Sequence, residues 1–343
     1  MRERSDNITV VGTGGIGGTV AAFLAKAGEN VTVVDTLVAH VKAIRSKGIL
    51  IDGVCGEQRV RFENVLFPEE VEGPLDFVIL AVKSQHTEDA LATIAPLLSD
   101  HGFIISLQNG LNEQRIAERV GSSRTIGAMV HVVADYVEPG HVTRFNEGQF
   151  YIGELNGRQT DRIQEIATRL SQAVPTYVTT NIWGYLWAKL IFSCQFAVTA
   201  LVDAPSSEIM KPEWSKRIFV ALMGEAVQVA LAERIILEEY DGFDPSVMLV
   251  RKGEDLPRAL EMLPTGSPKG NSGIWLDIKI RRRKTETEFL TGEVVRRGWK
   301  LGLPMMMNSQ ISQMIKEIEE GKRTMSWDNL RSLEKAADAR LPK

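Results

Sequence analysis

Glycines near the start of the chain are spaced as in a loop that binds phosphate. A β-branched run, residues 8–11, ends at Gly12, and Gly14 and Gly17 follow in the pattern Gly-x-Gly-x-x-Gly. In this pattern the first glycine permits a tight turn, the second lets backbone amides approach a pyrophosphate, and the third lets a helix pack closely on a strand. The alanine-rich segment 20–27 continues as a helix, whose N-terminal amides favour anions. The spacing predicts a dinucleotide site that includes Gly12, Thr13, Gly14, Gly15, Ile16 and Gly17.

An acidic residue follows at the distance where a nucleotide-binding fold places its ribose ligand. A second β-branched run, residues 31–34, ends at Asp35, about 20 residues past the glycines. A carboxylate there accepts hydrogen bonds from both ribose hydroxyls of NAD and repels the 2′-phosphate of NADP. We therefore expect NAD(H) to be favoured over NADP(H). The alternative is an ordinary strand–helix–strand unit without a ligand, but strand, turn, helix and acid all fall in register.

The elements that must position these residues alternate between strand and helix up to residue 180. Buried strands are predicted at 76–82 and 103–107, and they deliver Lys83-Ser84 and Gln108-Asn109-Gly110 to the sheet edge where doubly wound folds bind ligands. Further strands are predicted at 125–133 and 176–180, a small hairpin at 49–67, and helices at 37–47, 87–98, 112–120 and 162–173. This alternation predicts an α/β Rossmann domain over 1–180, with a doubly wound, mainly parallel sheet.

Helical patterns replace strand patterns after residue 180. Helices are predicted at 213–239, from 244 onward, at 286–300 and at 308–320, with a loop at 264–273. We therefore expect residues 181–343 to form a helical domain. The apolar run 190–202 is too short to span a bilayer and contains polar residues, so no membrane span is predicted.

The composition is typical of a globular protein with two domains. Of 343 residues, 44% are hydrophobic and 24% charged, and a net charge of −4 argues against nucleic acid as the main partner. Two cysteines cannot form a disulfide framework, and neither they nor the five histidines show the spacing of metal ligands. We expect a cytoplasmic protein with no metal, no membrane partner and no nucleic-acid partner.

Further motifs follow in a fixed order along both halves of the chain. They are Ala81-Val82-Lys83-Ser84, Gln108-Asn109-Gly110, Leu186-Trp187-Ala188-Lys189-Leu190, Thr199-Ala200-Leu201 and Lys284-Thr285-Glu286. Together with the glycine motif, they resemble the ketopantoate reductase (2-dehydropantoate 2-reductase) family nearly end to end. The resemblance implies a Rossmann domain, then an all-α domain of the 6-phosphogluconate dehydrogenase C-terminal-like type that binds substrate and forms a homodimer. It also implies NAD(P)H-linked reduction of a branched 2-keto acid such as 2-dehydropantoate, as in pantothenate biosynthesis, or the reverse oxidation.

The resemblance assigns roles to individual residues. Lys189 matches the catalytic lysine, whose ammonium can donate a proton to the developing oxyanion, particularly if desolvation lowers its pKa. Without the family pattern, this residue would be interpreted as a lysine reaching out from a core helix. Glu286 matches a glutamate that hydrogen-bonds a substrate hydroxyl, with a helix-capping acid as the alternative. Asn109 matches an asparagine that contacts cofactor ribose and substrate, Lys83 matches a cofactor-side lysine, and Ser272 lies near a substrate-binding serine.

Two places depart from the family pattern. Many members carry a basic residue for the 2′-phosphate where this chain has Asp35. The asparagines that follow the catalytic lysine and help to read a polar substrate are replaced here by Ser193 and by Gln195-Phe196-Ala197. Ser193 is therefore a candidate substrate ligand, and the loss of amides with the added ring of Phe196 favours a bulkier or more apolar substrate.

Several functions stay open on the sequence alone. One is a D-2-hydroxy-acid dehydrogenase with such a bulkier substrate. Another is a two-domain dehydrogenase of the glycerol-phosphate or 6-phosphogluconate type, against which the contexts of Lys189 and Glu286 argue. A different class is a non-catalytic NAD-binding sensor. The basic run 281–284 is interpreted as a solvated face, or as the source of a partner for the substrate carboxylate.

Overall fold

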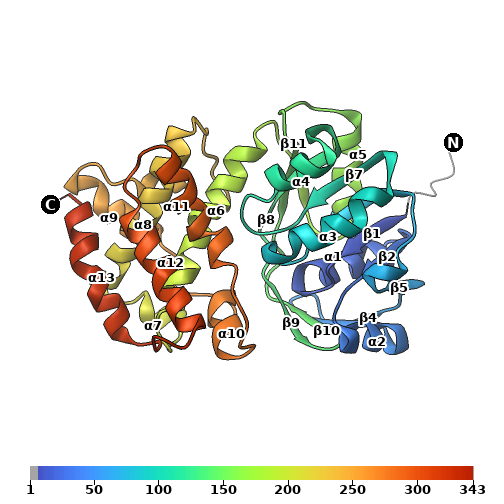
Figure 1. Ribbon diagram of the computed structural model, residues 1–343, viewed down its shortest axis with the longest axis horizontal. Helices are drawn as coiled ribbons and strands as arrows, with labels where there is room; N and C mark the ends of the chain where they lie inside the picture. The colour runs from blue at the N-terminus through green and yellow to red at the C-terminus, as the bar shows by residue number, and fades with distance from the viewer. Residues whose placement is uncertain (1–6, 343) are drawn as a thin grey trace. The chain divides into compact units, whose positions relative to one another are not determined.

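The computed structural model describes residues 7–342, which divide into two compact units; the first ends at Ile182 and the second begins at Trp183. The first unit is built on an eight-stranded sheet in the order β12-β11-β8-β7-β6-β1-β2-β5 (Figure 1). Its strands are β1 (Ile8–Val11), β2 (Val31–Val34), β5 (Asn64–Leu66), β6 (Leu75–Leu80), β7 (Leu98–Ser106), β8 (Thr125–Val130), β11 (Phe150–Glu154) and β12 (Thr176–Val178). All pairings from β5 to β8 are parallel, and only β11 runs antiparallel to its neighbour β8. The strand order reverses at β1, which confirms the predicted doubly wound sheet.

The carboxyl ends of four central strands are level with one another. Val11 of β1 pairs with both Val34 of β2 and Leu80 of β6, and Leu80 pairs in turn with Ser106 of β7. The sheet therefore delivers the loops that follow these four strands to one edge. The strands β1 and β2 are wholly buried runs of mainly β-branched residues, as expected for a parallel sheet that is covered on both faces.

Within the described part of the first unit, five α-helices accompany this sheet. They are α1 (Gly15–Lys26), α2 (Val38–Lys47), α3 (Thr87–Ile94), α4 (Glu113–Val120) and α5 (Asp161–Leu170). One buried cluster contains Leu24 of α1 and Ile166 of α5, and a second contains Leu91 of α3 and Ile116 of α4. Ile79 of β6 belongs to the first cluster, while the residues before and after it belong to the second. Because successive strand residues point to opposite faces, the helices cover both faces of the sheet.

A second, four-stranded sheet lies beside α1. The sequence indicated a small hairpin at 49–67 and short β-like runs at 141–153, but not that they join in one sheet. Its strands run in the order β4 (Gln58–Val60), β3 (Ile49–Gly53), β10 (His141–Arg144) and β9 (Ala134–Glu138). The antiparallel pair of β3 and β4 confirms the hairpin, but β3 also pairs in parallel with β10 from much later in the chain. Figure 1 shows β4, β9 and β10 gathered with α2 at one end of the unit. Since α1 packs on β3, β9 and β10, this sheet supports the helix that follows the glycine loop.

The second unit is helical, as predicted. Its helices are α6 (Ile182–Thr199), α7 (Ser206–Ile209), α8 (Glu213–Ala232), α9 (Leu256–Met262), α10 (Gly273–Lys279), α11 (Thr291–Lys300), α12 (Met306–Glu319) and α13 (Trp327–Arg340). The long helix α8 packs against α11, α12 and α13 (Figure 1). Within residues 7–342, we find no helix whose length and apolar character would let it cross a bilayer.

Several predicted helices differ in extent from those of the structure. The helix predicted at 213–239 stops at Ala232, because Arg234 adopts a left-handed backbone with a φ of 61°. The helix expected from residue 286 begins at Thr291, after a 3₁₀ turn at Thr287–Phe289. Only a 3₁₀ turn, Pro245–Met248, forms where a helix was expected from residue 244. No sequence pattern predicted α7, α10 or α13.

Candidate active site

The glycine loop between β1 and α1 is crowded at the two positions that the motif assigns to turning and packing. Gly12 has a φ of 91°, and a Cβ on it would lie 2.8 Å from the amide nitrogen of Val82. A Cβ on Gly17 would lie 1.9 Å from the carbonyl oxygen of Gly12. Any other residue at either position would have to move the backbone. The sharp turn and the close approach of α1 to β1 therefore require glycine.

Gly14, by contrast, leaves one side of the loop open. It is the N-cap of α1 and has no side chain to cap the first helix amides. A Cβ on Gly14 would meet no atom within 4 Å, whereas a Cβ on Gly15 would lie 2.7 Å from the amide nitrogen of Asp135 in β9. Ile16 lies half-buried in the first turn of α1. An uncapped helix start beside an open backbone face fits a bound pyrophosphate.

Asp35 follows β2 and is tied to the glycine loop. Its Oδ2 accepts hydrogen bonds from the Thr13 backbone amide at 2.8 Å and from the Thr13 hydroxyl at 2.9 Å. Its Oδ1 accepts one from the Leu37 amide at 2.9 Å. Because a carboxylate offers about four lone-pair positions, one on Oδ1 stays available to a ribose hydroxyl. The structure thus places Asp35 beside the loop, and it adds a role in holding Thr13 that the sequence did not indicate.

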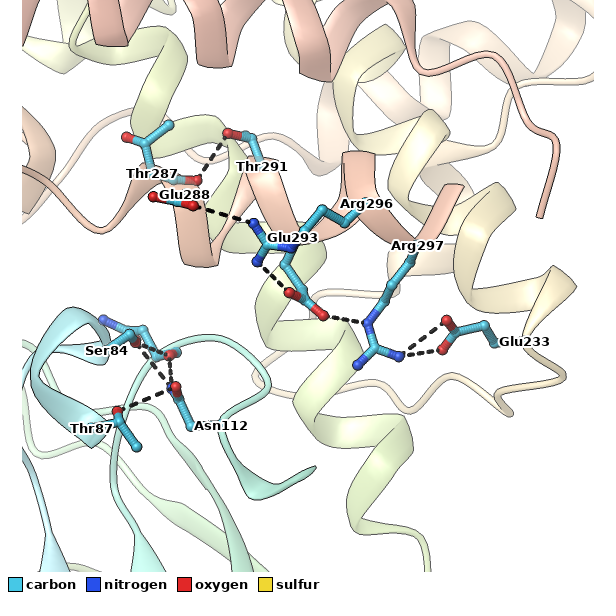
Figure 2. A network of polar contacts seen from close by, with 11 residues as sticks. Ser84, Thr87, Asn112, Glu233, Thr287, Glu288, Thr291, Glu293, Arg296 and Arg297 are labelled. Atoms are coloured by element: carbon cyan, nitrogen blue, oxygen red, sulfur yellow. Dashed lines mark hydrogen bonds and ion pairs between the residues drawn. The ribbon is translucent and has the colours of Figure 1, made fainter. Parts of the chain in front are cut away.

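Polar side chains join the loop after β6 to the loop after β7 (Figure 2). Asn112 donates from Nδ2 to the Ser84 hydroxyl at 3.0 Å and to the carbonyl oxygen of Asn109 at 2.8 Å. The Ser84 hydroxyl donates to the same carbonyl at 2.9 Å. These bonds hold the backbone of Asn109 at the edge of the sheet and do not use its side chain.

Gln108 strengthens the connection between these loops. Its Nε2 donates to the Val82 carbonyl at 2.9 Å and to the Thr87 hydroxyl at 2.8 Å. Lys83 follows Val82 in the chain. It is half-buried and is the N-cap of the 3₁₀ turn Ser84–His86. The predicted cofactor residues of the first unit therefore meet at one sheet edge. The sequence did not reveal the supporting roles of Ser84, Gln108 and Asn112, because their partners are 21 to 28 positions away.

Lys189 is the only charged residue among the 18 residues of α6. Its neighbours Trp187 and Leu190 are buried, so apolar packing holds this helix in place. Burial disfavours the ammonium, and the positive charge of Lys269 repels it; together they lower the pKa of Lys189 to about 8. The Lys189 Nζ lies 5.7 Å from the centroid of the Phe192 ring. A lysine in this setting can gain or lose a proton near neutral pH.

Aromatic rings share the face of α6 that carries Lys189. Phe192 and Phe196 stand edge to face with centroids 5.9 Å apart, and they follow Lys189 at helical spacings of three and seven. Phe192 also packs on Tyr240 and Phe243, with centroids 6.2 and 5.2 Å away. Tyr240 and Phe243 are buried, whereas Phe192 and Phe196 keep part of their surface accessible. The sequence indicated only Phe196, since the loop that carries Tyr240 and Phe243 is distant along the chain.

The two predicted substrate serines differ in what their hydroxyls bind. Ser193, one turn after Lys189, is buried, and its hydroxyl has no hydrogen-bond partner within residues 7–342. Ser272 is the N-cap of α10; its Oγ accepts from the Trp275 amide at 3.2 Å and donates to the Phe196 carbonyl at 3.1 Å. The hydroxyl of Ser272 thus holds α10 to α6.

The indole nitrogen of Trp275, which sequence reasoning missed, is also buried without a partner in the described part of the chain. Ser193 and Trp275 are the kind of buried polar groups that a ligand satisfies.

Glu286 lies at a turn whose backbone is anchored by α12. It is buried and is the N-cap of the 3₁₀ turn Thr287–Phe289, but its side chain makes no capping hydrogen bond. The alternative interpretation of Glu286 as a capping acid is therefore wrong. The preceding Thr285 donates to Glu319 Oε1 from its amide at 2.8 Å and from its hydroxyl at 2.6 Å. This pair of bonds fixes the chain immediately before Glu286.

Two arginines of the basic run 281–284 have a partner inside the fold. Arg281 and Arg283 both bind the buried carboxylate of Asp277, at 3.1 and 2.9 Å. They hold the C-terminal end of α10. Arg281 is half-buried, so the expectation of a solvated face is wrong for this one residue. Arg282, Arg283 and Lys284 are exposed, as a solvated face requires.

A chain of ion pairs links α11 to the helices around it (Figure 2). Glu293 binds both Arg296 and Arg297, and Arg297 also binds Glu233 at 2.9 Å, directly after α8. The guanidinium carbon of Arg297 lies 5.7 Å from the ring centroid of Trp187. Since Trp187 is two residues before Lys189, this contact helps to fix the part of α6 that carries the lysine.

Comparison with known proteins connects both units to a single family. Residues 8–157 match the family model described as ketopantoate reductase PanE/ApbA, and residues 181–319 match the model described as its C terminal. The curated 2-dehydropantoate 2-reductase of Pyrococcus horikoshii is 28% identical over 316 residues, which are 91% of this chain and 97% of that protein.

Solved structures share the fold over most of the chain. A PanE/ApbA family ketopantoate reductase from Ralstonia eutropha is 27% identical with a TM-score of 0.77, over 93% of this chain and 100% of that one. A ternary structure of D-mandelate dehydrogenase with NADH and anilino(oxo)acetate gives a TM-score of 0.81 at 20% identity, over 93% of this chain and 100% of that one.

Proposed function

Because the chain belongs to the ketopantoate reductase family, we propose that it transfers a hydride between NAD(H) and a 2-keto acid, forming or consuming the D-2-hydroxy acid. The first unit would hold the dinucleotide, and the α6 face of the second unit would bind the keto acid. One observation carries the catalytic part of this proposal. Lys189 is the lone charge of an apolar helix, and burial lowers its pKa to about 8.

The sheet edge of the first unit fits a dinucleotide. The uncapped start of α1 and the open side of Gly14 suit the pyrophosphate, and the remaining lone pair of Asp35 suits a ribose hydroxyl. Lys83 and Asn109 would contact the cofactor from the loops after β6 and β7. When bound, the nicotinamide supplies or accepts the hydride.

We propose NAD(H) rather than NADP(H) as the working cofactor. A 2′-phosphate would lie against the carboxylate of Asp35, which accepts three hydrogen bonds from Thr13 and Leu37. Arg45, the nearest arginine after β2, donates to the Val65 carbonyl and pairs with Glu70. Its guanidinium is therefore already engaged and does not offset the negative charge at Asp35.

Lys189 would donate or accept the proton that accompanies hydride transfer. Its ammonium stabilises the oxyanion that develops on the keto carbon and donates a proton to it, and the neutral amine takes that proton back in oxidation. A pKa of about 8 keeps both forms of Lys189 accessible near neutral pH. Glu286 and Asn109 would orient the substrate by hydrogen bonds. Ser193 would bind a polar group of the substrate, while Ser272 would act mainly by holding α10.

We propose that the side chain of the keto acid is bulkier or more apolar than that of ketopantoate. Phe192 and Phe196 present partly accessible rings on the same face as Lys189. Gln195, which replaces a family asparagine, donates its amide nitrogen to the Phe192 carbonyl at 2.9 Å. The face therefore offers apolar surface and few amides, so a substrate hydroxyl gains little there and an apolar side chain gains more.

Initial rates across a panel of 2-keto acids test the whole proposal. We expect NADH to be oxidised faster than NADPH, and kcat/KM to rise from pyruvate through ketopantoate to phenylpyruvate. Lys189→Ala should still bind NADH, while its turnover falls by about 10² or more, the usual scale for a general acid–base group. Lys322→Ala, at a lysine that is 70% exposed, is the matched control and should not change the rate.

Two other outcomes would contradict the proposal. Binding of NADH without turnover of any keto or hydroxy acid would favour a non-catalytic sensor. Normal turnover by Lys189→Ala would remove the lysine from the role given to it.

A further inference from the structure

We propose that His40 is a positioning residue of the dinucleotide site, which turns the Gly14 amide toward the phosphates by holding the Thr13 carbonyl on the opposite side. This inference rests on the proposed nucleotide site but not on the identity of the substrate. No sequence pattern indicates this role, because His40 is one of five scattered histidines.

Each ring nitrogen of His40 meets one backbone group. The side chain is 1% exposed, and its Nδ1 accepts from the amide of Gly140, between β9 and β10, at 2.9 Å. Its Nε2 lies 2.9 Å from the carbonyl oxygen of Thr13. An amide only donates and a carbonyl only accepts, so both bonds are satisfied when the neutral imidazole carries its proton on Nε2. The ring also packs edge-on against Tyr136, with centroids 5.2 Å apart. His40 thus connects the second sheet to the glycine loop.

The bond to Thr13 fixes the direction of one peptide plane. In a trans peptide, the C=O and the following N–H point in opposite directions, and the one cis peptide of the described chain lies elsewhere, before Pro74. The Thr13 carbonyl points to the inner side of the loop, where a Cβ on Gly18 would lie 2.8 Å from its oxygen. The Gly14 N–H must therefore point outward. The space beside Gly14 is open, since a Cβ built on it meets no atom within 4 Å.

The other polar groups of Thr13 prevent the loop from relaxing in a different way. Its amide and hydroxyl both donate to Asp35, so all three of its polar groups are bonded. Thr13 is fully buried, and its carbonyl would lose its partner without His40. Rotation of the Thr13–Gly14 peptide would relieve that loss, and it would also turn the Gly14 amide away from the phosphates.

Two substitutions separate the two bonds of His40. In His40→Asn the shorter side chain reaches the position of Nδ1, so it can bind Gly140 but not Thr13. In His40→Gln the longer side chain places an amide donor at the position of Nε2, where it can bind Thr13. His141→Phe is a matched control, since His141 is partly exposed on β10 and pairs with Asp52 at 2.9 Å.

The probes are ADP, which contains the pyrophosphate, and adenosine, which does not, with their binding measured by competition against NADH fluorescence. For His40→Asn we expect ADP binding to weaken by about tenfold or more, the effect of one lost hydrogen bond to a charged group, with adenosine unchanged. His40→Gln should retain most of the ADP affinity, and His141→Phe all of it.

Two results would contradict the proposed role of His40. Equal ADP affinity in the asparagine and glutamine variants, or equal losses for ADP and adenosine, would show that His40 only supports the fold. If His40→Asn does not fold by circular dichroism, His40→Phe, which keeps the packing on Tyr136 and removes both bonds, takes its place under the same criteria. A wild-type protein that binds neither ADP nor NADH would instead contradict the proposed function.

Discussion

Among single residues, Lys189 determines how the reaction should respond to pH. In the proposed mechanism, its ammonium is the acid for reduction, and its neutral amine is the base for oxidation. Because burial lowers the pKa of Lys189 to about 8, kcat/KM for keto-acid reduction should fall as the pH rises through about 8. For hydroxy-acid oxidation it should rise over the same interval. Rates in both directions between pH 6 and 10, at limiting substrate, measure this.

Lys189→Arg is the control for this pH dependence. A guanidinium stays protonated throughout the range, so the inflection near pH 8 should vanish in both directions, whatever the remaining rate. If the arginine variant kept the inflection, the titration would belong to another group.

Glu113 gives the fold a pH dependence of its own. It begins α4, is fully buried, and neither of its carboxylate oxygens has a hydrogen-bond partner among the residues that the structure describes. Burial raises the pKa of Glu113 from 4.5 to about 8. Between these values the unfolded chain releases a proton that the folded chain keeps. The free energy of unfolding should therefore fall as the pH rises through this window and level off above it.

The variant Glu113→Gln isolates this effect, because its amide is neutral in both states. Relative to wild type, the variant should gain stability as the pH rises from 4.5 to about 8, by on the order of a few kcal/mol. Urea unfolding at several pH values measures the difference. A difference that does not change with pH would show that the carboxyl is already ionised in the folded protein.

At the scale of secondary-structure elements, the carboxylate of Glu225 in α8 caps the N-terminal end of α12. Glu225 is fully buried and accepts from the amides of Met307 and Asn308 and from Asn308 Nδ2, each at 2.9 Å. These amides have no partner within the helix itself. Glu225→Ala should lower the free energy of unfolding by about 3 kcal/mol, because it leaves buried donors unpaired.

A surface carboxylate provides the comparison for Glu225. Glu334→Ala removes an ion pair with Arg331 in α13, a pair whose side chains are 34% and 54% exposed. Its effect on the free energy of unfolding should be under about 1 kcal/mol. Equal effects of the two substitutions in urea titrations would mean that Glu225 does not support the start of α12.

At the scale of the whole molecule, the features that could be predicted from the sequence are the local ones. The glycine loop, its acidic partner and the central strands follow from spacing and periodicity within short segments. The bonds of Asn112 to Ser84 and of His40 to Gly140 join residues 28 and 100 positions apart, which no periodicity reveals. The strands β3 and β10 also pair although they lie far apart in the chain, so the second sheet as a whole was not predicted.

The candidate site of the second unit shows the same limit. Lys189 was identified from its motif, and its setting in an apolar helix is visible in the sequence itself. The bond of Ser272 to the Phe196 carbonyl and the packing of Phe192 on Phe243 depend on how distant segments meet. The position of Ser272 in the family pattern could therefore suggest a substrate ligand. It could not show that the Ser272 hydroxyl already donates to the Phe196 carbonyl.

The pairing of β3 with β10 also has a consequence for the order in which the protein is made. A nascent chain that has not passed residue 134 contains every glycine of the loop and its acidic partner. It lacks the strand on which Gly15 packs and the Gly140 amide that orients His40. We therefore expect nucleotide affinity to appear only after residues up to Arg144 have been made, and a fragment designed to bind a dinucleotide should extend beyond Arg144.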